Sequence, residues 1–240
     1  MLQFKRLSTA LCCAFCALPA LLMADGSVID KVYHPYVEQL EWELEWRATH
    51  ASEDPATGEE RLQLHRFGLG RAVSEYVYVE GYLIAEQSAD ESMALEAYEL
   101  EVLWQLSEQG EYAVDYGVLF ELEKEHKRDI WEGSAALLLE KELGRFSVTA
   151  NLGLTYEGGS DIDDEWESAL ALQSRYRYSP RFEPALELYS GEDTLGAGPV
   201  LLGLERLGSS RALKWQAGVI FGIDKDTADY TLRALLEYEF

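Results

Sequence analysis

The chain has 240 residues, of which 48% are hydrophobic, and its 44 acidic residues against 20 basic ones give a formal net charge of −24. A charge of this sign argues against DNA or RNA as a partner, because phosphate binding requires basic patches. It is compatible with an acidic surface or lumen that attracts cations, and also with acidic groups that only solubilise loops and interior positions.

The first 24 residues have the pattern of a secretory signal peptide. Lys5 and Arg6 form a basic head, residues 7–23 form an uncharged and mostly apolar run, and Ala24 is a small residue at its end. The run is short for a membrane-spanning helix, so we predict export and cleavage after Ala24. Cleavage removes two basic residues and no acidic one, which leaves the mature chain with a net charge of −26.

All three cysteines, Cys12, Cys13 and Cys16, lie in this predicted signal peptide. The mature chain is therefore predicted to contain neither a disulfide nor a thiolate metal site. The residues before these cysteines are not the small ones of a lipoprotein signal. No other apolar stretch approaches the length of a spanning helix, so any membrane crossing must use strands.

Residues 25–37 are predicted to form a periplasmic N-terminal lead, and residues 38–240 a single β-domain. In that domain apolar and polar residues alternate in twelve successive runs, as in strands with two different faces. The runs lie near residues 40–47, 62–69, 77–83, 98–105, 114–121, 131–140, 146–156, 170–178, 182–189, 200–207, 213–221 and 230–240. A change of phase at His65 and Arg66 predicts a β-bulge, and the run at 200–207 is ambiguous.

The connections between these runs are predicted to alternate in length. The longer ones are 51–60, 87–92, 124–129, 158–164, 191–198 and 224–229, and the shorter ones are 72–75, 107–110, 143–145, 179–181 and 208–211. Both ends of the β-domain then lie on the side of the short turns.

The final run, Tyr230–Phe240, alternates cleanly and ends on an aromatic residue. A closing strand that ends in Tyr238-x-Phe240 resembles the C-terminal strand of bacterial outer-membrane β-barrel proteins. The resemblance implies an all-β, single antiparallel up-and-down transmembrane β-barrel of about 12 strands, with short periplasmic turns and longer extracellular loops. It also implies that Tyr238 and Phe240 belong to the signal that the barrel-assembly machinery recognises.

A soluble β-sandwich also alternates, with its apolar face buried. The export signal, the length of the runs, the connections and a set of aromatic residues near the ends of the apolar faces favour the membrane barrel. These aromatic residues are Trp46, Tyr98, Trp104, Tyr112, Phe120, Trp131, Phe146, Tyr156, Tyr176, Tyr178, Phe182, Phe221, Tyr230, Tyr238 and Phe240. We therefore predict a location in the outer membrane of a Gram-negative bacterium, with outer-membrane lipid and lipopolysaccharide as partners.

If the apolar face contacts lipid, the polar face lines the lumen. The candidate acidic cluster of the lumen is Glu41, Glu43, Glu45, Glu99, Glu101, Asp115, Glu121, Glu237 and Glu239. Its candidate basic partners are Arg47, Arg175, Arg177, Lys214 and Arg233. The first and last strands are neighbours in a closed barrel. Arg233, and more distantly Lys214, is therefore expected to face the glutamates of the first strand.

An acidic lumen predicts a porin-like channel or transporter for small solutes, with cations as candidate cargo, because carboxylate rings select cations. The alternative is a closed-lumen structural or interaction barrel whose internal salt bridges fill the interior and whose acidic loops act. A third hypothesis is an outer-membrane lipid-modifying enzyme. The sequence has no GxSxG, HExxH or phosphate-loop motif, and no serine stands at a diagnostic spacing from His34, His50, His65 or His126. We therefore predict no enzymatic activity.

The acidic stretch Asp161–Glu165 looks like the start of a calcium loop. It lacks the turn glycine and has Leu172 where an EF-hand has its bidentate glutamate. Gly68-Leu69-Gly70 lacks the third glycine and the helix of a dinucleotide site. We predict no cofactor and no dedicated metal site, and loose binding of divalent cations by the acidic outer loops stays an alternative.

Overall fold

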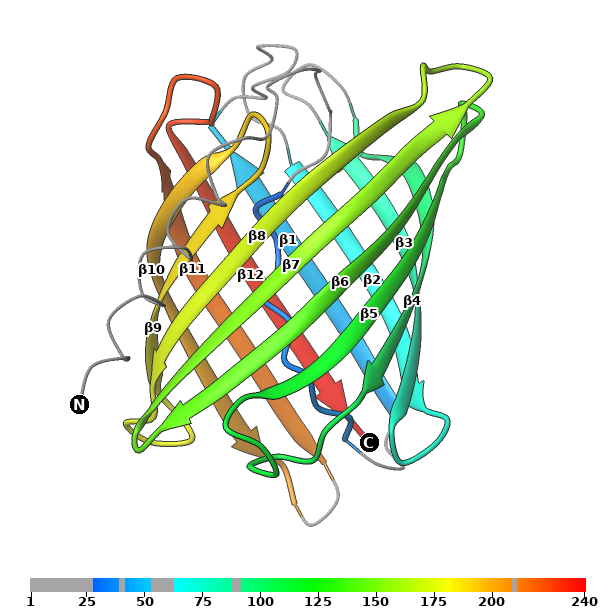
Figure 1. Cartoon of the computed structure of the whole chain (residues 1–240). Coiled ribbons are helices and arrows are strands. Elements are labelled where there is room, and N and C mark those ends of the chain that lie inside the picture. Colours follow the sequence, from blue (N-terminus) through cyan, green and yellow to red (C-terminus); the bar gives the residue numbers. More distant parts are fainter. Residues whose placement is uncertain (1–27, 39–41, 53–62, 88–91, 209–210) are drawn as a thin grey trace, which may run out of the picture.

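The computed structural model describes residues 28–38, 42–52, 63–87, 92–208 and 211–240. These residues form a closed antiparallel barrel in which each strand pairs with its neighbours in sequence and the last strand pairs with the first (Figure 1). The strands are β1 Trp42–Ala51, β2 Gln63–Ala72, β3 Val77–Gln87, β4 Ala94–Gln105, β5 Asp115–Glu125, β6 Ile130–Leu143, β7 Phe146–Gly159, β8 Glu165–Tyr176, β9 Glu183–Ser190, β10 Leu195–Arg206, β11 Ala212–Gly222 and β12 Tyr230–Glu239. The predicted all-β, up-and-down barrel of twelve strands is confirmed.

The chain described by the structure contains no helix that is long and apolar enough to cross a membrane.

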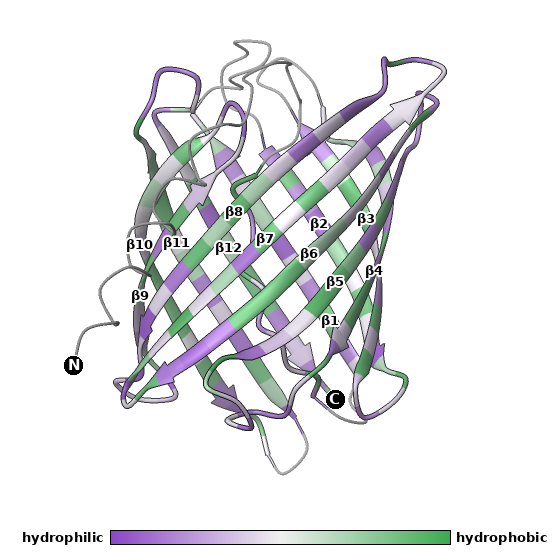
Figure 2. Cartoon of the chain, viewed as in Figure 1, coloured by the Kyte–Doolittle hydropathy of each residue, from purple (hydrophilic) through white to green (hydrophobic). Residues whose placement is uncertain are grey.

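The two faces of the barrel wall have opposite character, which appears in Figure 2 as alternating colours along the strands. Leu83 and Leu100 point outward and are 51% and 47% exposed, whereas Glu80 and Glu101 point inward and are 2% and 3% exposed. A soluble β-sandwich buries its apolar face instead. The outer face therefore suits contact with hydrocarbon, and the polar residues face the lumen.

The connections alternate between the two ends of the barrel, as predicted. One end, called here the turn end, holds the start of β1, the end of β12 and the connection 144–145. The opposite end, called the loop end, holds the connections 126–129 and 191–194. Strict alternation in length does not hold, because the connection 106–114 at the turn end is longer than these two at the loop end.

The predicted bulge at His65 and Arg66 is wrong. Strand β2 pairs with β1 and with β3 in unbroken register. The phase changes because Leu64 is an apolar residue on the inner face, where it packs against the cluster of Tyr82, Ile84 and Ala97. The irregularity in this region lies instead between Ile84 and Ala85, in the pairing of β3 with β4.

Residues 28–38, called here the N-terminal segment, lie inside the barrel. Figure 1 shows the segment in dark blue, running through the interior toward the end at which the C terminus lies. At the loop end, a Cβ added to Gly191 would lie 2.8 Å from Val28. At the turn end, Glu38 Oε1 lies 2.9 Å from Lys214 Nζ. The expected periplasmic lead thus differs from the structure, in which the described part of residues 25–37 is luminal.

An apolar contact holds the half of the N-terminal segment that is nearer the loop end. Ile29 and Val32 are buried against Tyr189 of β9, Val200 of β10 and Ile220 of β11. This contact explains the ambiguous pattern of β10, because its inward side chains face an apolar part of the segment instead of water. The inner surface of β9–β11 is therefore built to hold residues of the chain itself.

We expect Leu100→Arg to lower the free energy of unfolding in lipid vesicles by about 2–4 kcal/mol, because it places a charge at mid-membrane depth. Leu100 is in the middle of β4 and faces outward. Equilibrium unfolding in urea, followed by tryptophan fluorescence, measures the change. Leu100→Phe keeps an apolar side chain there and serves as the control. Equal stability of Leu100→Arg and wild type would contradict a lipid-facing position.

Candidate functional site

The register of the strands brings carboxylates side by side on the inner face. The paired positions are Glu43 with Glu239, Glu45 with Glu237, Glu80 with Glu101, Glu99 with Glu123, and Glu101 with Glu121. Like charges directly opposite one another destabilise a sheet. The arrangement therefore requires cations between the carboxylates, and the N-terminal segment and the wall both supply them.

Arg47 of β1 is at the centre of the charge network. Its guanidinium lies 3.0 Å from Asp30, 2.9 Å from Glu45 and 3.1 Å from Glu101. It also donates a hydrogen bond of 2.7 Å to the hydroxyl of Tyr33, which in turn donates one of 2.6 Å to Glu101. Arg47 thus joins the N-terminal segment to β1 and β4, and with 3% exposure it does so out of contact with bulk water.

Two lysines neutralise the glutamates nearer the turn end. Lys31 of the N-terminal segment lies 2.5 Å from Glu45. Lys214 of β11 lies 2.6 Å from Glu237 and also contacts Glu239. The position of Lys214 beside the carboxylates of the closing strand agrees with its expected luminal location.

Arg233 of β12 has a different partner from the expected one. It pairs in register with Thr49 of β1, closer to the loop end than Glu45. Its guanidinium lies 2.7 Å from Glu187 of β9 and donates a hydrogen bond of 3.1 Å to the hydroxyl of Tyr189. The long side chain reaches away from β1, so strand neighbourhood alone did not predict its ion pair.

A second group of charges surrounds His34 of the N-terminal segment. His34 Nδ1 lies 2.5 Å from Glu140 of β6. Arg175 and Arg177 approach the other oxygen of Glu140 at 3.9 Å and 3.7 Å. Arg177 also lies 2.7 Å from Glu142. Both arginines are thus luminal and belong to a cluster that includes the N-terminal segment.

The backbone of the N-terminal segment forms hydrogen bonds to side chains of the wall. Asn151 accepts one from the Tyr33 amide and donates one to the Tyr33 carbonyl, both at 2.8 Å. The Val37 amide donates to Gln105 at 2.8 Å. The Tyr36 hydroxyl donates to Asp115, also at 2.8 Å. Backbone without regular structure is stable at membrane depth when protein groups satisfy it in this way.

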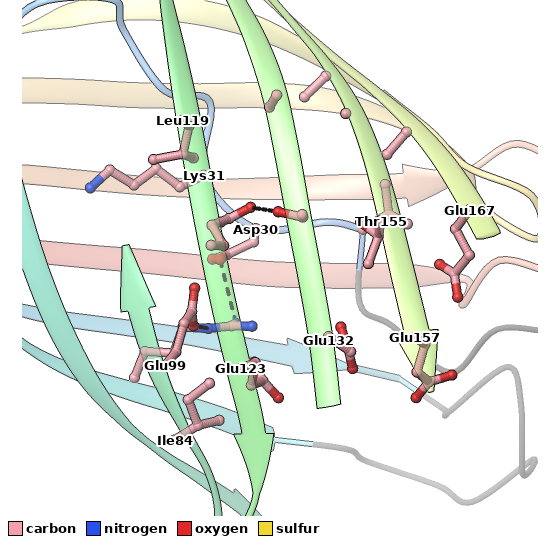
Figure 3. A pocket seen from close by; sticks show the side chains of 18 of the residues that line it. Asp30, Lys31, Ile84, Glu99, Leu119, Glu123, Glu132, Thr155, Glu157 and Glu167 are labelled. Atoms are coloured by element: carbon pink, nitrogen blue, oxygen red, sulfur yellow. Dashed lines mark hydrogen bonds and ion pairs between the residues drawn. The ribbon is translucent and has the colours of Figure 1, made fainter. Parts of the chain in front are cut away.

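An acidic cavity, called here the vestibule, occupies the loop-end half of the lumen (Figure 3). Its volume is about 570 Å³. Its acidic lining residues are Asp30, Glu86, Glu96, Glu99, Glu121, Glu123, Glu125, Glu132, Glu157, Glu167 and Glu192. The basic ones are Lys31, Arg66 and Arg128. The N-terminal segment contributes the floor of the vestibule through Asp30, Lys31 and Tyr33.

Two groups of described carboxylates are close enough to hold a metal ion. They are Glu43, Glu45 and Glu237, and Glu99, Glu101 and Glu121. Basic side chains already contact both groups, among them Lys31 at Glu45 and Arg66 at Glu99. The chain's own cations can therefore balance these carboxylates, and we assign no metal to them.

Within the described residues, the hydrogen bonds of His34, His65 and His126 do not go to a serine. His34 contacts Glu140 and Thr149. His65 accepts a hydrogen bond from the indole of Trp46 at 3.3 Å, and His126 contacts the hydroxyl of Tyr98 at 3.3 Å.

Glu41 and the predicted signal peptide, residues 1–24, lie outside the described residues. Tyr238 and Phe240, the expected assembly signal, stack with ring centroids 5.7 Å apart. The Phe240 amide donates a hydrogen bond of 2.9 Å to the Trp42 carbonyl, beside the seam between β12 and β1. Recognition of these two residues by the assembly machinery stays a prediction.

Among the site residues that sequence analysis missed are those of the N-terminal segment. They do not alternate, so the signal that placed the strands does not apply to them. The available clue was composition, because the short stretch Tyr33-His34-Pro35-Tyr36 combines aromatic rings with hydrogen-bonding groups.

No protein-family model matches the chain, and no curated protein matches it. Solved structures match its fold. One is the KdgM porin in complex with disordered oligogalacturonate, with a TM-score of 0.54 and 9% identity, covering 82% of this chain and 98% of that one. Another is an outer-membrane channel from Pseudomonas putida F1, with a TM-score of 0.57 and 10% identity, covering 85% of this chain and 97% of that one. The chain therefore has the fold of the bacterial outer-membrane β-barrel proteins.

Proposed function

We propose that this protein is an outer-membrane channel that admits small cationic solutes through the vestibule. In this proposal the loop end faces the outside of the cell, and the N-terminal segment controls the path between the vestibule and the turn end. The outer membrane and its lipopolysaccharide are the surroundings that the apolar outer face fits.

The composition of the vestibule carries this proposal. Ten glutamates and Asp30 line it, against Lys31, Arg66 and Arg128. A cavity with low-dielectric walls focuses the field of such an excess and raises the local concentration of cations. Rings of carboxylates select cations in channels for the same reason.

The likeness to the KdgM porin extends to the fold and not to its cargo. That porin was solved with oligogalacturonate, which is a polyanion. The carboxylates of the vestibule would repel a polyanion, so we assign the opposite charge to the solute of this chain.

A closed-lumen structural or interaction barrel is the second candidate function. The observation that favours it is the N-terminal segment, which forms hydrogen bonds or ion pairs with strands on several sides of the wall. Ion current separates the two candidates, because only the channel conducts.

We expect the wild-type protein in planar lipid bilayers to conduct ions with a preference for cations. Replacing Glu123, Glu132 and Glu167 together with glutamine should move the cation-to-anion permeability ratio toward one, because these acids line the vestibule. The reversal potential in a salt gradient measures this ratio.

A matched control changes the same charge at the turn end. Glu75, Glu108 and Glu111 lie in the connections 73–76 and 106–114, and their replacement with glutamine should leave the ratio unchanged. Absence of current from correctly folded wild type would contradict the channel. Equal effects of the two triple variants would contradict the role of the vestibule.

A further inference from the structure

The ammonium group of Lys31 lies against a group of glutamates on the barrel wall. Glu43, Glu45 and Glu237 each place one carboxylate oxygen within 4.8 Å of the others. The Lys31 Nζ lies 2.5 Å from Glu45 Oε2. We call Glu43, Glu45, Glu80 and Glu237 the carboxylate cage, and the position of Glu80 completes it.

Glu80 extends from β3 across β2 toward Glu45 of β1. Gly68 separates them, since it pairs in register with Glu45. A Cβ added to Gly68 would lie 2.4 Å from Glu80 Oε1, so the carboxylate occupies the space above this glycine. A side chain at position 68 would block this approach, and its absence lets Glu80 approach the cage.

One oxygen of Glu80 has no hydrogen-bond partner. The residue is 2% exposed, and its Oε1 is buried without a donor. A buried carboxylate oxygen without a donor carries a desolvation cost, which a ligand with additional N–H groups would relieve. Glu80 lies outside the close group of Glu43, Glu45 and Glu237, so its orphaned oxygen is a separate observation. It indicates that the cage can accept more donors than it now receives.

Among the described residues, three cations contact the cage, and one of them belongs to a part of the chain that is distinct from the wall. Lys214 of β11 contacts Glu237 and Arg47 of β1 contacts Glu45. Lys31 is on the N-terminal segment, whereas all four glutamates are on strands β1, β3 and β12. In Figure 3, Lys31 extends away from Glu123, Glu132 and Glu157 of the vestibule. The ammonium group is therefore a tethered occupant of a site that the barrel wall forms.

The geometry suits a primary ammonium group in particular. An ammonium is a compact charge with three rotatable donors, so it can bond to several carboxylates that converge from different strands. Tyr82 donates a hydrogen bond of 3.0 Å to Glu45 Oε1, which Arg47 also contacts at 2.9 Å, so Glu45 Oε2 is left to the ammonium. A quaternary ammonium carries the same charge but has no N–H to donate.

We propose that the carboxylate cage is a binding site for solutes with a primary ammonium group and that Lys31 occupies it as a built-in competitor. The proposal deepens the proposed function, since it rests on a cation channel for the route by which the solute arrives. Binding itself requires only access to the cage. Because Lys31 is tethered, its effective concentration is high and a free amine must displace it.

Butylammonium is the probe, because it reproduces the lysine side chain. Isothermal titration calorimetry on the full chain, purified and folded in detergent micelles, measures its binding. We expect Lys31→Met to bind butylammonium with a dissociation constant at least about tenfold below that of wild type. Adding Glu80→Gln to Lys31→Met should weaken this binding, because it removes one carboxylate of the cage.

Lys31→Arg is the matched control. It keeps a tethered cation in the cage and should bind butylammonium as weakly as wild type does. Tetramethylammonium should not bind Lys31→Met, because it has no N–H. Heat-modifiable migration on gels checks that each variant is folded, and Lys31→Gln replaces Lys31→Met if the latter does not fold.

Two outcomes would overturn the proposal. One is that folded Lys31→Met, or Lys31→Gln in its place, binds butylammonium no better than wild type. The other is equal binding of tetramethylammonium and butylammonium, which would mean that charge alone is recognised. Neither outcome depends on ion current, so failure of the channel function and failure of the cage are distinguishable.

Discussion

Deleting residues 28–38 is expected to raise the single-channel conductance several-fold over that of wild type. The segment runs through the lumen from Gly191 at the loop end to Lys214 at the turn end. A lumen of this strand number lies between those of filled small barrels and open porins, so removing a chain from it widens the path substantially. Recordings of single channels in planar bilayers, at one salt concentration on both sides, provide the measurement.

A synthetic peptide with the sequence of residues 28–38 provides the control for this deletion. Added to the deletion variant, it should restore the low conductance, because the wall keeps the partners of the segment. The same peptide with Val32 replaced by glutamate should not, since Val32 is 1% exposed in an apolar contact with β9–β11. Unchanged conductance after deletion would show that the segment does not limit the path.

The second large effect is expected at Arg47, where alanine should lower the free energy of unfolding by about 3–5 kcal/mol. The substitution leaves Asp30, Glu45 and Glu101 close together without the guanidinium that now contacts all three. Buried carboxylates that lose their cation carry the full cost of desolvation and mutual repulsion. Urea unfolding in lipid vesicles, followed by tryptophan fluorescence, measures the change.

Arg181→Ala is the control for this loss. Arg181 lies 3.2 Å from Glu205, but its side chain is 77% exposed, so water screens the pair. Its removal should change the stability far less than removal of Arg47. If the two variants lost equal stability, the luminal network would contribute no more than a surface ion pair.

Together these predictions give the N-terminal segment two roles. Its contacts with Arg47 and with the apolar surface of β9–β11 stabilise the barrel from within. In the proposed channel, its position across the lumen limits the path that leads on from the vestibule. The deletion variant is therefore expected to conduct better and to unfold more easily.

The positions of the strands and the faces of their side chains followed from the sequence, because residues adjacent in the chain determine them. Side chains alternate along a strand with a period of two, so Leu100 and Glu101 had to lie on opposite sides of the wall. The placement of Glu45 and Glu237 on neighbouring strands also followed, since a closed barrel must pair its first strand with its last.

The regular pairing of β2 at His65 and Arg66 and the ion-pair partner of Arg233 did not follow from the same pattern. At His65 and Arg66 the pattern changed because Leu64 packs inside the barrel, and a residue's inward packing depends on strands distant in sequence. Arg233 meets Glu187 because a long side chain can choose among several carboxylates. The alternation shows that a side chain is luminal, but it does not show which carboxylate across the lumen that side chain contacts.

The sequence by itself determined an inside-out barrel with an acidic interior, because alternation is local and the excess of acid is a matter of composition. Only the tertiary structure decided that the N-terminal segment lies in that interior. Its contacts join residues distant in the chain, such as Tyr33 with Asn151 and Lys31 with Glu45. A segment without regular structure has no period to read, and its location depends on the shape and charge of a lumen that exists only after the barrel has closed.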